Sequence, residues 1–477
     1  MSASIESKKL SSVPKTKLYG GILGIVLALV IFALPLGLEM TARITLALSV
    51  WLITWLIFTP IESGYTALIF LFAMLLLKYE SASLFTWFYI APGWFQIASF
   101  VIAAAMIKSG LAKRLAYFLM WKLKANTVPR FLLVSVVVAF VMILLIPSPT
   151  AMVAILFPLT IYVAEAWNLP ARSETKKGVP AIALVSFFFL ILCGQAGSWI
   201  KTGFSLNLLT MRMAGVEIEW FEWFKLAAPI VWICGLLTAV LINFVFKPSK
   251  DIIAPMDVLK TKVDEFGSMT KKEKIVLAIM IIVLILWVTE SYHKISSGWI
   301  ALAAILVLAI PQFKIFDSFD EAIRSINWTV IIFIAGIQAM STCLNTSGAS
   351  QVIAKVLEVF KPATATGYYA ASSFIGTFIT SIVGINFQQG ISIPIMVGWA
   401  QEVGLSASKG LIAAWLPSVI GGYLFCSLLP STLFAWTFKY KGEKLFTIGD
   451  GFKISLVLFV AYFITAALIQ STLWNIL

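Results

Sequence analysis

Long apolar segments, separated by short polar connections, run along almost the whole chain. They cover residues 18–36, 42–60, 64–77, 94–107, 131–164, 179–200, 226–246, 275–289, 297–312, 328–344, 362–400, 410–438 and 452–475. A helix of about 20 apolar residues crosses the roughly 30 Å of hydrocarbon in a bilayer. The pattern therefore predicts an all-α polytopic membrane protein, because a membrane barrel would show short alternating strands instead.

Two of these segments, 131–164 and 362–400, are too long for one span and are interrupted near the middle. Pro147 and Pro149 interrupt the first, since proline lacks a backbone N–H and ends the preceding helix. Gly384 and Gly390 interrupt the second. We expect both to be re-entrant hairpins, the first entering from the cytoplasm and the second from outside. About 11 full transmembrane helices then remain.

The composition agrees with a polytopic membrane protein. Hydrophobic residues make up 60% of the chain and charged residues 12%, with a mean hydropathy of +0.97. A soluble domain of 477 residues needs more surface charge. The net charge of +13 comes from connections rather than from a basic stripe, so we expect no nucleic-acid partner.

Lysine and arginine are concentrated in four connections, which predicts the orientation of the chain in the bilayer. These connections are residues 1–17, 108–130, 247–274 and 438–453. Positively charged connections stay in the cytoplasm during insertion. We therefore expect a multi-pass protein of the cytoplasmic (inner) membrane, with its N-terminus inside and its C-terminus outside.

Short matches recur in the same order in the two halves of the chain, at nearly constant separation. "KKGVPAIAL" resembles "SKGLIAAWL", and "EWFKLAAPIV" resembles "DGFKISLVLF". Pro158 corresponds in the same way to Pro394. An odd number of spans in each copy would invert the second one. We predict an inverted-topology repeat, which is common in secondary transporters.

Hydroxyl groups lie at the first break, where Ser148 and Thr150 alternate with the two prolines. The helix that begins there would point free N–H groups at the break, and such helix N-termini bind anions. The alternative is that Ser148 only caps its own helix.

Uncharged polar side chains lie at the second break, in the sequence "VGINFQQGISIP". Asn386, Gln388 and Gln389 can each donate hydrogen bonds without adding a charge. Two helix tips that meet near the middle of the membrane would suit a substrate with two separated anionic groups.

Two further apolar segments, 193–209 and 426–438, are interrupted by small and polar residues. Ser198 in the first corresponds to Ser431 in the second. The first also holds Lys201, and a buried lysine in a membrane span is usually functional. The alternative is that its long side chain reaches the outer membrane surface.

The sequence lacks the patterns of several other protein classes. No Asp or Glu lies deep within a predicted span, whereas cation antiporters normally need one there. The four cysteines are scattered in apolar segments, and the one histidine, His293, lies in a connection. We predict no enzymatic activity, no catalytic residue and no cofactor.

The chain resembles the divalent anion/sodium symporter family of di- and tricarboxylate transporters. The likeness covers nearly the whole chain, including "KSGLAKRLA", "INWTVIIFIAGIQAM" and "PSPTA" at the place of the Ser-Asn-Thr signature. "KTGFSLNLLTMRMAG" is similar to the segment of the citrate and 2-oxoglutarate/malate exchanger branch that carries an asparagine, here Asn207. The family implies a homodimer in which a transport domain moves like an elevator along a scaffold domain.

The resemblance and the repeat together divide the chain. We expect a cytoplasmic tail, a first repeat, a cytoplasmic linker and a second repeat at residues 1–17, 18–246, 247–274 and 275–477. The scaffold spans would be 18–128 and 275–360, and the hairpin and transport spans 129–246 and 361–477. The predicted substrate-binding residues are Ser148, Pro149, Thr150, Ser198, Lys201, Thr202, Asn207, Asn386, Gln388, Gln389, Ser431 and Thr432.

We expect an exchanger of small organic dianions, and the family resemblance implies that these are C4-dicarboxylates, 2-oxoglutarate or citrate. In the family, the signature residues also hold sodium, but Pro149 and Gly384 remove oxygen ligands here. Lys201 would instead supply a fixed positive charge. The alternatives are a sodium-coupled symporter of carboxylates or of sulfate, with sodium near Ser148 and Gly384, and a non-transporting membrane scaffold.

Overall fold

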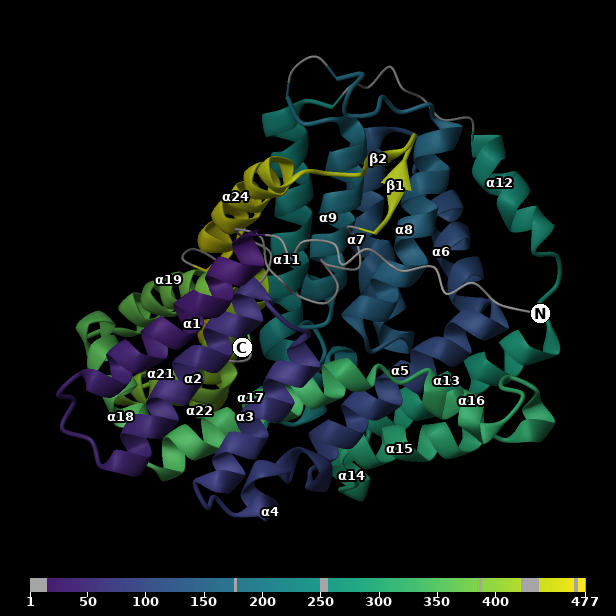
Figure 1. Ribbon diagram of the computed structural model, residues 1–477. Coiled ribbons are helices and arrows are strands. Elements are labelled where there is room, and N and C mark those ends of the chain that lie inside the picture. Colours follow the sequence, from purple (N-terminus) through teal and green to yellow (C-terminus); the bar gives the residue numbers. More distant parts are fainter. Residues whose placement is uncertain are drawn as a thin grey trace, which may run out of the picture. The chain divides into compact units, whose positions relative to one another are not determined.

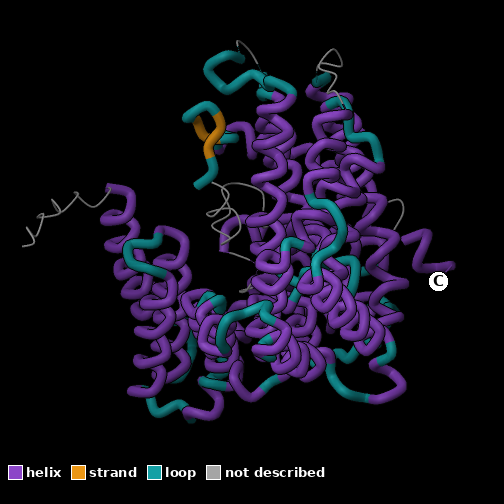
Figure 2. Tube along the Cα trace, turned by 90° about the vertical axis from the view of Figure 1, so that its right-hand side faces the viewer, coloured by secondary structure: helices purple, strands orange, loops and turns teal. Residues whose placement is uncertain are grey.

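The structure is a computed structural model that describes residues 15–175, 178–248, 256–383, 385, 388–421, 437–466 and 471–476. The described chain is almost entirely helical, as Figure 2 shows. Each of the predicted apolar segments contains at least one helix. The chain divides into two compact units, one formed by residues 1–85 and 332–352 and the other by the rest.

The first unit holds the N-terminal helices and most of α17, a helix from the second half of the chain. Its elements are α1 (Lys15–Ala33), α2 (Met40–Phe58), α3 (Ser63–Leu76), α4 (Ser81–Leu84) and α17 (Trp328–Thr346). Helix α1 lies close against α2, where the Trp55 indole donates a hydrogen bond to the Gly21 carbonyl at 3.0 Å. A Cβ atom at Gly336 of α17 would lie only 2.7 Å from that of Ala67 in α3. Small residues thus allow the close helix packing that is typical of membrane interiors.

The second unit contains all described candidate site residues. Its first half consists of η1 (Thr86–Tyr89), α5 (Ala91–Ser109), α6 (Leu111–Lys122), α7 (Val128–Leu145), α8 (Pro149–Ala166), α9 (Ala181–Ala196), η2 (Lys201–Gly203), α10 (Ser205–Ala214) and α11 (Trp220–Phe246). Then follow α12 (Met256–Glu265), α13 (Lys271–Val288), α14 (Glu290–His293), α15 (Ser297–Leu308), η3 (Pro311–Phe313) and α16 (Phe319–Arg324). Helix α18 (Ser350–Leu357) leads back into this unit.

The last part of the second unit carries the second break. Its elements are η4 (Glu358–Phe360), α19 (Ala365–Val383), the π-helical turn η5 (Gln388–Ser392), α21 (Ile393–Glu402), α22 (Ala407–Gly421), β1 (Lys439–Tyr440), β2 (Glu443–Lys444), α24 (Ile448–Ile464) and α25 (Ser471–Ile476). Helix α9 packs against both α7 and α8, and these three helices lie together in Figure 1. Helix α19 packs mainly on α22.

Six described helices are long and apolar enough to cross a membrane by length and composition: α2, α5, α7, α8, α11 and α17. Shorter apolar helices occur at residues 17–33, 63–76, 181–196 and 297–308. The protein is therefore a polytopic helical membrane protein, as the sequence predicted. The total of 11 spans and the inverted repeat stay predictions.

The connection that leads into α24 departs slightly from an all-α fold. Residues 439–444 form a two-stranded antiparallel hairpin in which Lys439 pairs with Lys444. The Tyr440 hydroxyl can donate to the carbonyls of Ala164 and Leu169, at 3.0 and 2.9 Å, which ties the hairpin to the end of α8. In the same cluster, a hydrogen bond from Lys441 holds the pKa of Glu174 below its usual range.

Candidate functional site

The first break is a short non-helical stretch between α7 and α8. Helix α7 ends at Leu145, and Pro149 occupies the first turn of α8, where its missing N–H costs nothing. Ser148 is the N-cap of α8, and its hydroxyl accepts a hydrogen bond from the Ala151 N–H at 3.4 Å. Ser148 therefore caps its own helix, while Thr150 is half-buried in the first turn. Both α7 and α8 have 18 residues, so the re-entrant course stays a prediction.

The second break contains a π-helical turn, a rare form that is frequent at functional sites. Gln388 and Gln389 lie in this turn and are fully buried. The side chain of Gln388 accepts a hydrogen bond from the Thr380 hydroxyl. Two other predicted residues of this break, Gly384 and Asn386, lie outside the described residues.

Gln389 joins the second break to α10, a helix from the first half of the chain. Its amide nitrogen donates to the Leu206 carbonyl at 2.7 Å and to the Thr210 hydroxyl. Because a carbonyl can only accept, the Leu206 contact fixes which end of the amide is nitrogen. The Gln389 carbonyl oxygen is buried and, within the described part of the chain, has no hydrogen-bond partner.

Further buried polar atoms, most of them close to the second break in the sequence, also lack a hydrogen-bond partner among the described residues. They are the amide nitrogen of Gln388 and the hydroxyls of Thr377 and Ser392, together with the hydroxyl of Ser198 in the first half. Leaving such a group unsatisfied costs about 1–3 kcal/mol, and native proteins contain few of them. These atoms therefore have hydrogen-bonding capacity that no described residue uses. Thr377 and Ser392 were missed by the sequence analysis, since hydroxyls in apolar helices are too common to stand out.

The connection between α9 and α10 is held by Asn207. Its amide nitrogen donates to the carbonyls of Gly197, Ile200 and Lys201, at 2.7, 2.9 and 3.2 Å. Its oxygen accepts from the indole of Trp415 in α22 at 2.8 Å. Asn207 is completely buried and uses both ends of its amide within the protein. It thus sets the shape of the interrupted segment, as the sequence predicted an interruption there.

Two tryptophans at the start of α11 satisfy other groups of the same connection. The Trp220 indole donates to the Thr202 hydroxyl at 3.1 Å, and the Trp223 indole donates to the Ser198 carbonyl at 2.9 Å. Gly203 is required here, because a Cβ atom would lie 2.6 Å from the Gly197 carbonyl oxygen. The predicted residues Ser198 and Thr202 are therefore fixed against α11.

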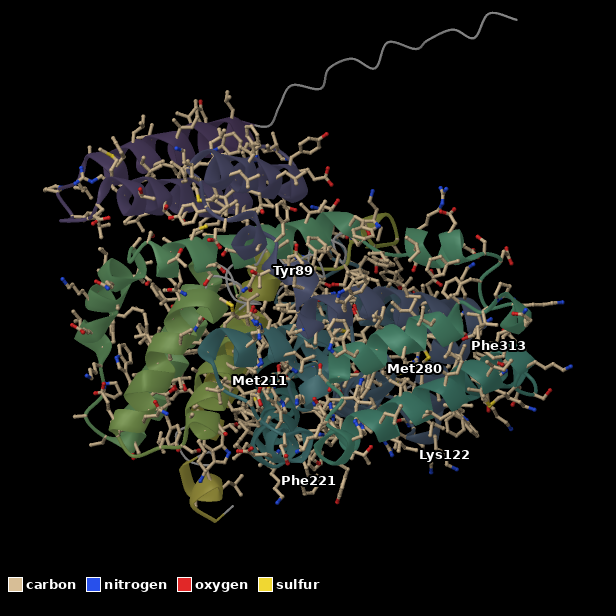
Figure 3. The ribbon with its side chains drawn as sticks, turned by 90° about the horizontal axis from the view of Figure 1, so that it is seen from below. Tyr89, Lys122, Met211, Phe221, Met280 and Phe313 are labelled. Carbon is tan, nitrogen blue, oxygen red and sulfur yellow. The ribbon has the colours of Figure 1, made fainter. Side chains whose placement is uncertain are left out.

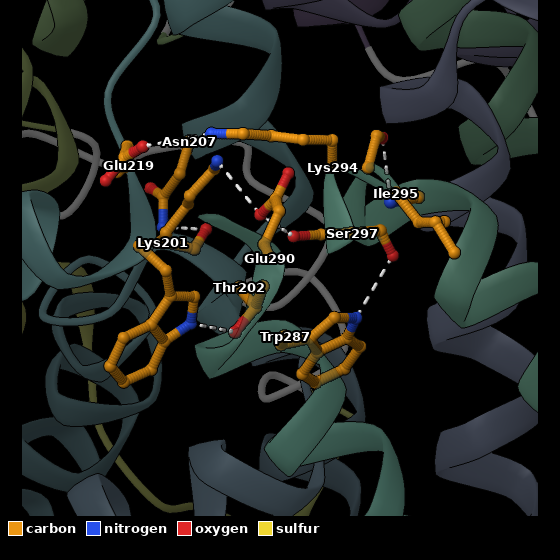
Figure 4. Close-up of polar contacts among 12 residues, drawn as sticks. Lys201, Thr202, Asn207, Glu219, Trp287, Glu290, Lys294, Ile295 and Ser297 are labelled. Carbon is orange, nitrogen blue, oxygen red and sulfur yellow. Dashed lines mark hydrogen bonds and ion pairs between the residues drawn. The ribbon is translucent and has the colours of Figure 1, made fainter. Parts of the chain in front are cut away.

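Lys201 is buried, with 7% of its surface exposed, and forms an ion pair with Glu290 at 3.0 Å. Figure 4 shows its side chain directed to Glu290, on the connection between α13 and α15. The charge of Lys201 is thus balanced within the protein. An anion that used Lys201 as a counter-charge would have to compete with Glu290.

Helix α10 brings several of the predicted residues together. It contains Asn207, contacts Gln389, and follows directly on Lys201 and Thr202. Its first residue, Ser205, donates to the side chain of Gln96 in α5, a contact that the sequence analysis missed. Among the described residues, no recorded hydrogen bond joins Ser148 or Thr150 to this group. Ser431 and Thr432 lie outside the described residues.

In the part of the chain that the structure describes, no group of three or more His, Cys, Asp or Glu side chains could hold a metal ion. The described site therefore consists of amides, hydroxyls, backbone carbonyls and one ion pair. Such groups can orient a polar or anionic ligand by hydrogen bonds.

Comparison with known proteins gives one family match over nearly the whole chain. The model of the family described as "Sodium:sulfate symporter transmembrane region" matches residues 15–474. The dicarboxylate transporter 2.1 of Arabidopsis thaliana chloroplasts is 26% identical over 445 residues, covering 88% of this chain and 74% of the relative.

The names of two bacterial relatives differ in the coupling that they describe. The sodium-dependent dicarboxylate transporter SdcS of Staphylococcus saprophyticus is 21% identical over 396 residues, covering 77% of this chain and 75% of the relative. The citrate/succinate antiporter of Escherichia coli is 24% identical over 272 residues, covering 54% of this chain and 52% of the relative. The chain spans only 59%, 62% and 55% of the length of three further relatives.

Proposed function

The chain belongs to the sodium:sulfate symporter family, and we propose that it is a secondary transporter that exchanges small organic dianions across the cytoplasmic membrane. The substrates proposed are C4-dicarboxylates, 2-oxoglutarate or citrate. The names of the three relatives, which specify dicarboxylates or citrate and succinate, support this substrate class.

The observation that carries the proposal is the set of buried polar atoms around the second break. Gln389 contacts α10 with one end of its amide and leaves the other end free of any described partner. The unpartnered atoms of Gln388, Thr377 and Ser392 belong to the same stretch of chain. Irregular backbone at membrane depth is tolerated where it is buried in protein or lines a cavity, and binding sites of transporters are built in this way.

The proposal includes the architecture that the family resemblance implies. The two interrupted segments would be re-entrant hairpins of an inverted repeat, and the hairpin and transport spans, 129–246 and 361–477, would move against the scaffold in a homodimer. Three predicted binding residues, Asn386, Ser431 and Thr432, lie outside the described residues and would complete the site.

Counterflow into proteoliposomes tests the function directly. The purified protein is reconstituted with internal succinate, malate, 2-oxoglutarate, citrate or sulfate, and uptake of the corresponding labelled anion is measured. We expect uptake of at least one carboxylate that depends on internal carboxylate. If only sulfate is taken up, the protein is an inorganic anion transporter instead.

The coupling mode is tested in the same vesicles by replacing sodium with choline. We expect exchange to continue at a similar rate, because Pro149 and Gly384 offer no side-chain oxygen for a sodium ion. A strict sodium requirement would establish the alternative, a sodium-coupled symporter of carboxylates.

A matched pair of substitutions at the first break separates capping from binding. Ser148→Ala removes the N-cap of α8 and is expected to lower the free energy of unfolding by about 1 kcal/mol. Thr150→Ala leaves that cap intact and is expected to weaken the apparent affinity about tenfold, the effect of one hydrogen bond to a charged group. Thermal unfolding in detergent and the concentration dependence of exchange measure the two effects. Unchanged affinity in Thr150→Ala would remove Thr150 from the site.

A further inference from the structure

Two ion pairs connect the same two stretches of the chain. One stretch runs from the end of α9 to the start of α11, and the other is the connection between α13 and α15. Lys201 pairs with Glu290 at 3.0 Å, and Glu219 pairs with Lys294 at 3.5 Å. Each stretch therefore contributes one positive and one negative side chain. Each of them faces a side chain of opposite charge on the other stretch, as Figure 4 shows. This arrangement is complementary and specifies one alignment of the two stretches.

The stretch between α9 and α11 is fixed by its own hydrogen bonds. Asn207 holds the backbone carbonyl of Lys201, and Trp220 holds the hydroxyl of Thr202. Lys201 therefore keeps its backbone position whether or not Glu290 is present.

The connection between α13 and α15 is also held by hydrogen bonds of its own. The Ser297 hydroxyl donates to the Glu290 carboxylate at 2.7 Å, and the Trp287 indole donates to the Ser297 carbonyl at 3.0 Å. Each side of the contact is thus held by hydrogen bonds other than the two ion pairs.

The two stretches belong to different groups of packed helices. Helices α13 and α15 pack mainly on each other and on α5, whereas α9 packs mainly on α7 and α8, and α11 on α24 and α7. The two groups also touch through α10, which packs on α5, and through smaller contacts of α13 with α7 and α11. In Figure 3, Met211 of α10 and Phe221 of α11 lie near the middle of the view, and Met280 of α13 and Phe313 of η3 lie further to the right. The ion pairs therefore cross from one helix group to the other.

We propose that the two ion pairs form a latch that holds these helix groups in one end state and opens during each transport cycle. This proposal rests on the proposed transport function. An ion pair suits such a contact, because its charges can be hydrated again when it opens. Glu219 and Lys294 are already largely exposed, and the buried pair Lys201–Glu290 gives the contact its strength.

Charge reversal tests the latch. Lys201→Glu places two carboxylates together, and Glu290→Lys places two amines together, so each single variant is expected to lower the exchange rate about tenfold or more. The double variant Lys201→Glu/Glu290→Lys restores an opposite pair and is expected to recover most of the rate. No recovery in a folded double variant would overturn the latch.

A control reversal uses an ion pair that lies within a single exposed helix. Asp320 and Arg324 are one turn apart in α16, and both are mostly exposed. The double variant Asp320→Arg/Arg324→Asp is expected to exchange anions like the wild type. A loss as large as that of Lys201→Glu would show that reversal itself damages the protein, and would overturn the latch.

A distance measurement tests the latch without reference to any substrate. Spin labels are attached to Glu219→Cys and Lys294→Cys in the full chain, reconstituted in liposomes, while the buried pair stays intact. We expect a short and a long distance, with the long one favoured by Lys201→Glu and the short one regained in the charge-reversed double variant. A single short distance in all these variants would overturn the latch. If instead two distances appear but no carboxylate is exchanged, only the proposed substrate class fails.

Discussion

Asn207→Asp is expected to abolish anion exchange and to destabilise the protein. The substitution changes one NH₂ group to an oxygen in a completely buried position. That nitrogen donates to three backbone carbonyls, of which the closest, that of Gly197, is 2.7 Å away. A carboxylate there would face three acceptors and bury an unpaired charge, which costs several kcal/mol. We expect the exchange rate to fall at least 100-fold, since about 2.7 kcal/mol already corresponds to that factor.

Thermal unfolding in detergent and counterflow in proteoliposomes measure the two consequences of Asn207→Asp. Asn345→Asp is the matched control, because Asn345 is exposed in α17 and the chemical change is the same. The control is expected to behave like the wild type. Normal exchange by Asn207→Asp would show that the connection between α9 and α10 does not depend on this side chain.

The apolar pattern of the sequence predicted the long helices, because a long apolar segment is sufficient to indicate a helix that lies in lipid. A run such as 226–246 can only be a helix in a bilayer, and α11 includes all of it. The amphipathic helices α6 and α12 were not predicted, since they lie in polar connections where apolar length gives no signal. Leu111 and Leu259 are buried on their packed faces, a feature that only the tertiary structure reveals.

The breaks in the helices were also predictable, because proline and glycine act locally. Ile146 to Ser148 separate α7 from α8, close to the position that Pro147 and Pro149 indicate. The partners of the side chains at these breaks were not predictable. Glu290 is separated from Lys201 by 89 positions, and nothing in either local sequence connects them. In the sequence, Lys201 looks like an unpaired positive charge. The structure shows that Glu290 balances this charge.

The contacts of α10 with the second half of the chain could not be predicted from the sequence either. The sequence marked Asn207 through a family resemblance and Gln389 through its place in a break, but it gave no reason to bring the two together. The structure places Gln389 against Leu206 and Thr210, on the helix that also carries Asn207. One helix therefore connects the interrupted segment of the first half with the break of the second.

Gln389→Leu is expected to weaken substrate binding 10- to 100-fold while changing stability little. The carbonyl of Leu206 still accepts from the Thr210 hydroxyl at 2.7 Å, so the substitution leaves neither group of α10 without a partner. Leucine also fits a fully buried position. What is lost is the free amide oxygen of Gln389 and its fixed orientation.

A hydrogen bond to a charged ligand contributes about 1.5–3 kcal/mol, and this range corresponds to the expected change in affinity. The concentration dependence of counterflow measures the affinity, and thermal unfolding in detergent measures the stability. Gln401→Leu is the control, because Gln401 is exposed near the end of α21 and the chemical change is the same. Unchanged affinity in Gln389→Leu would place the substrate away from the second break. A large loss of stability would instead show that the contact between Gln389 and α10 serves the fold, because an apolar side chain of similar size could not replace it.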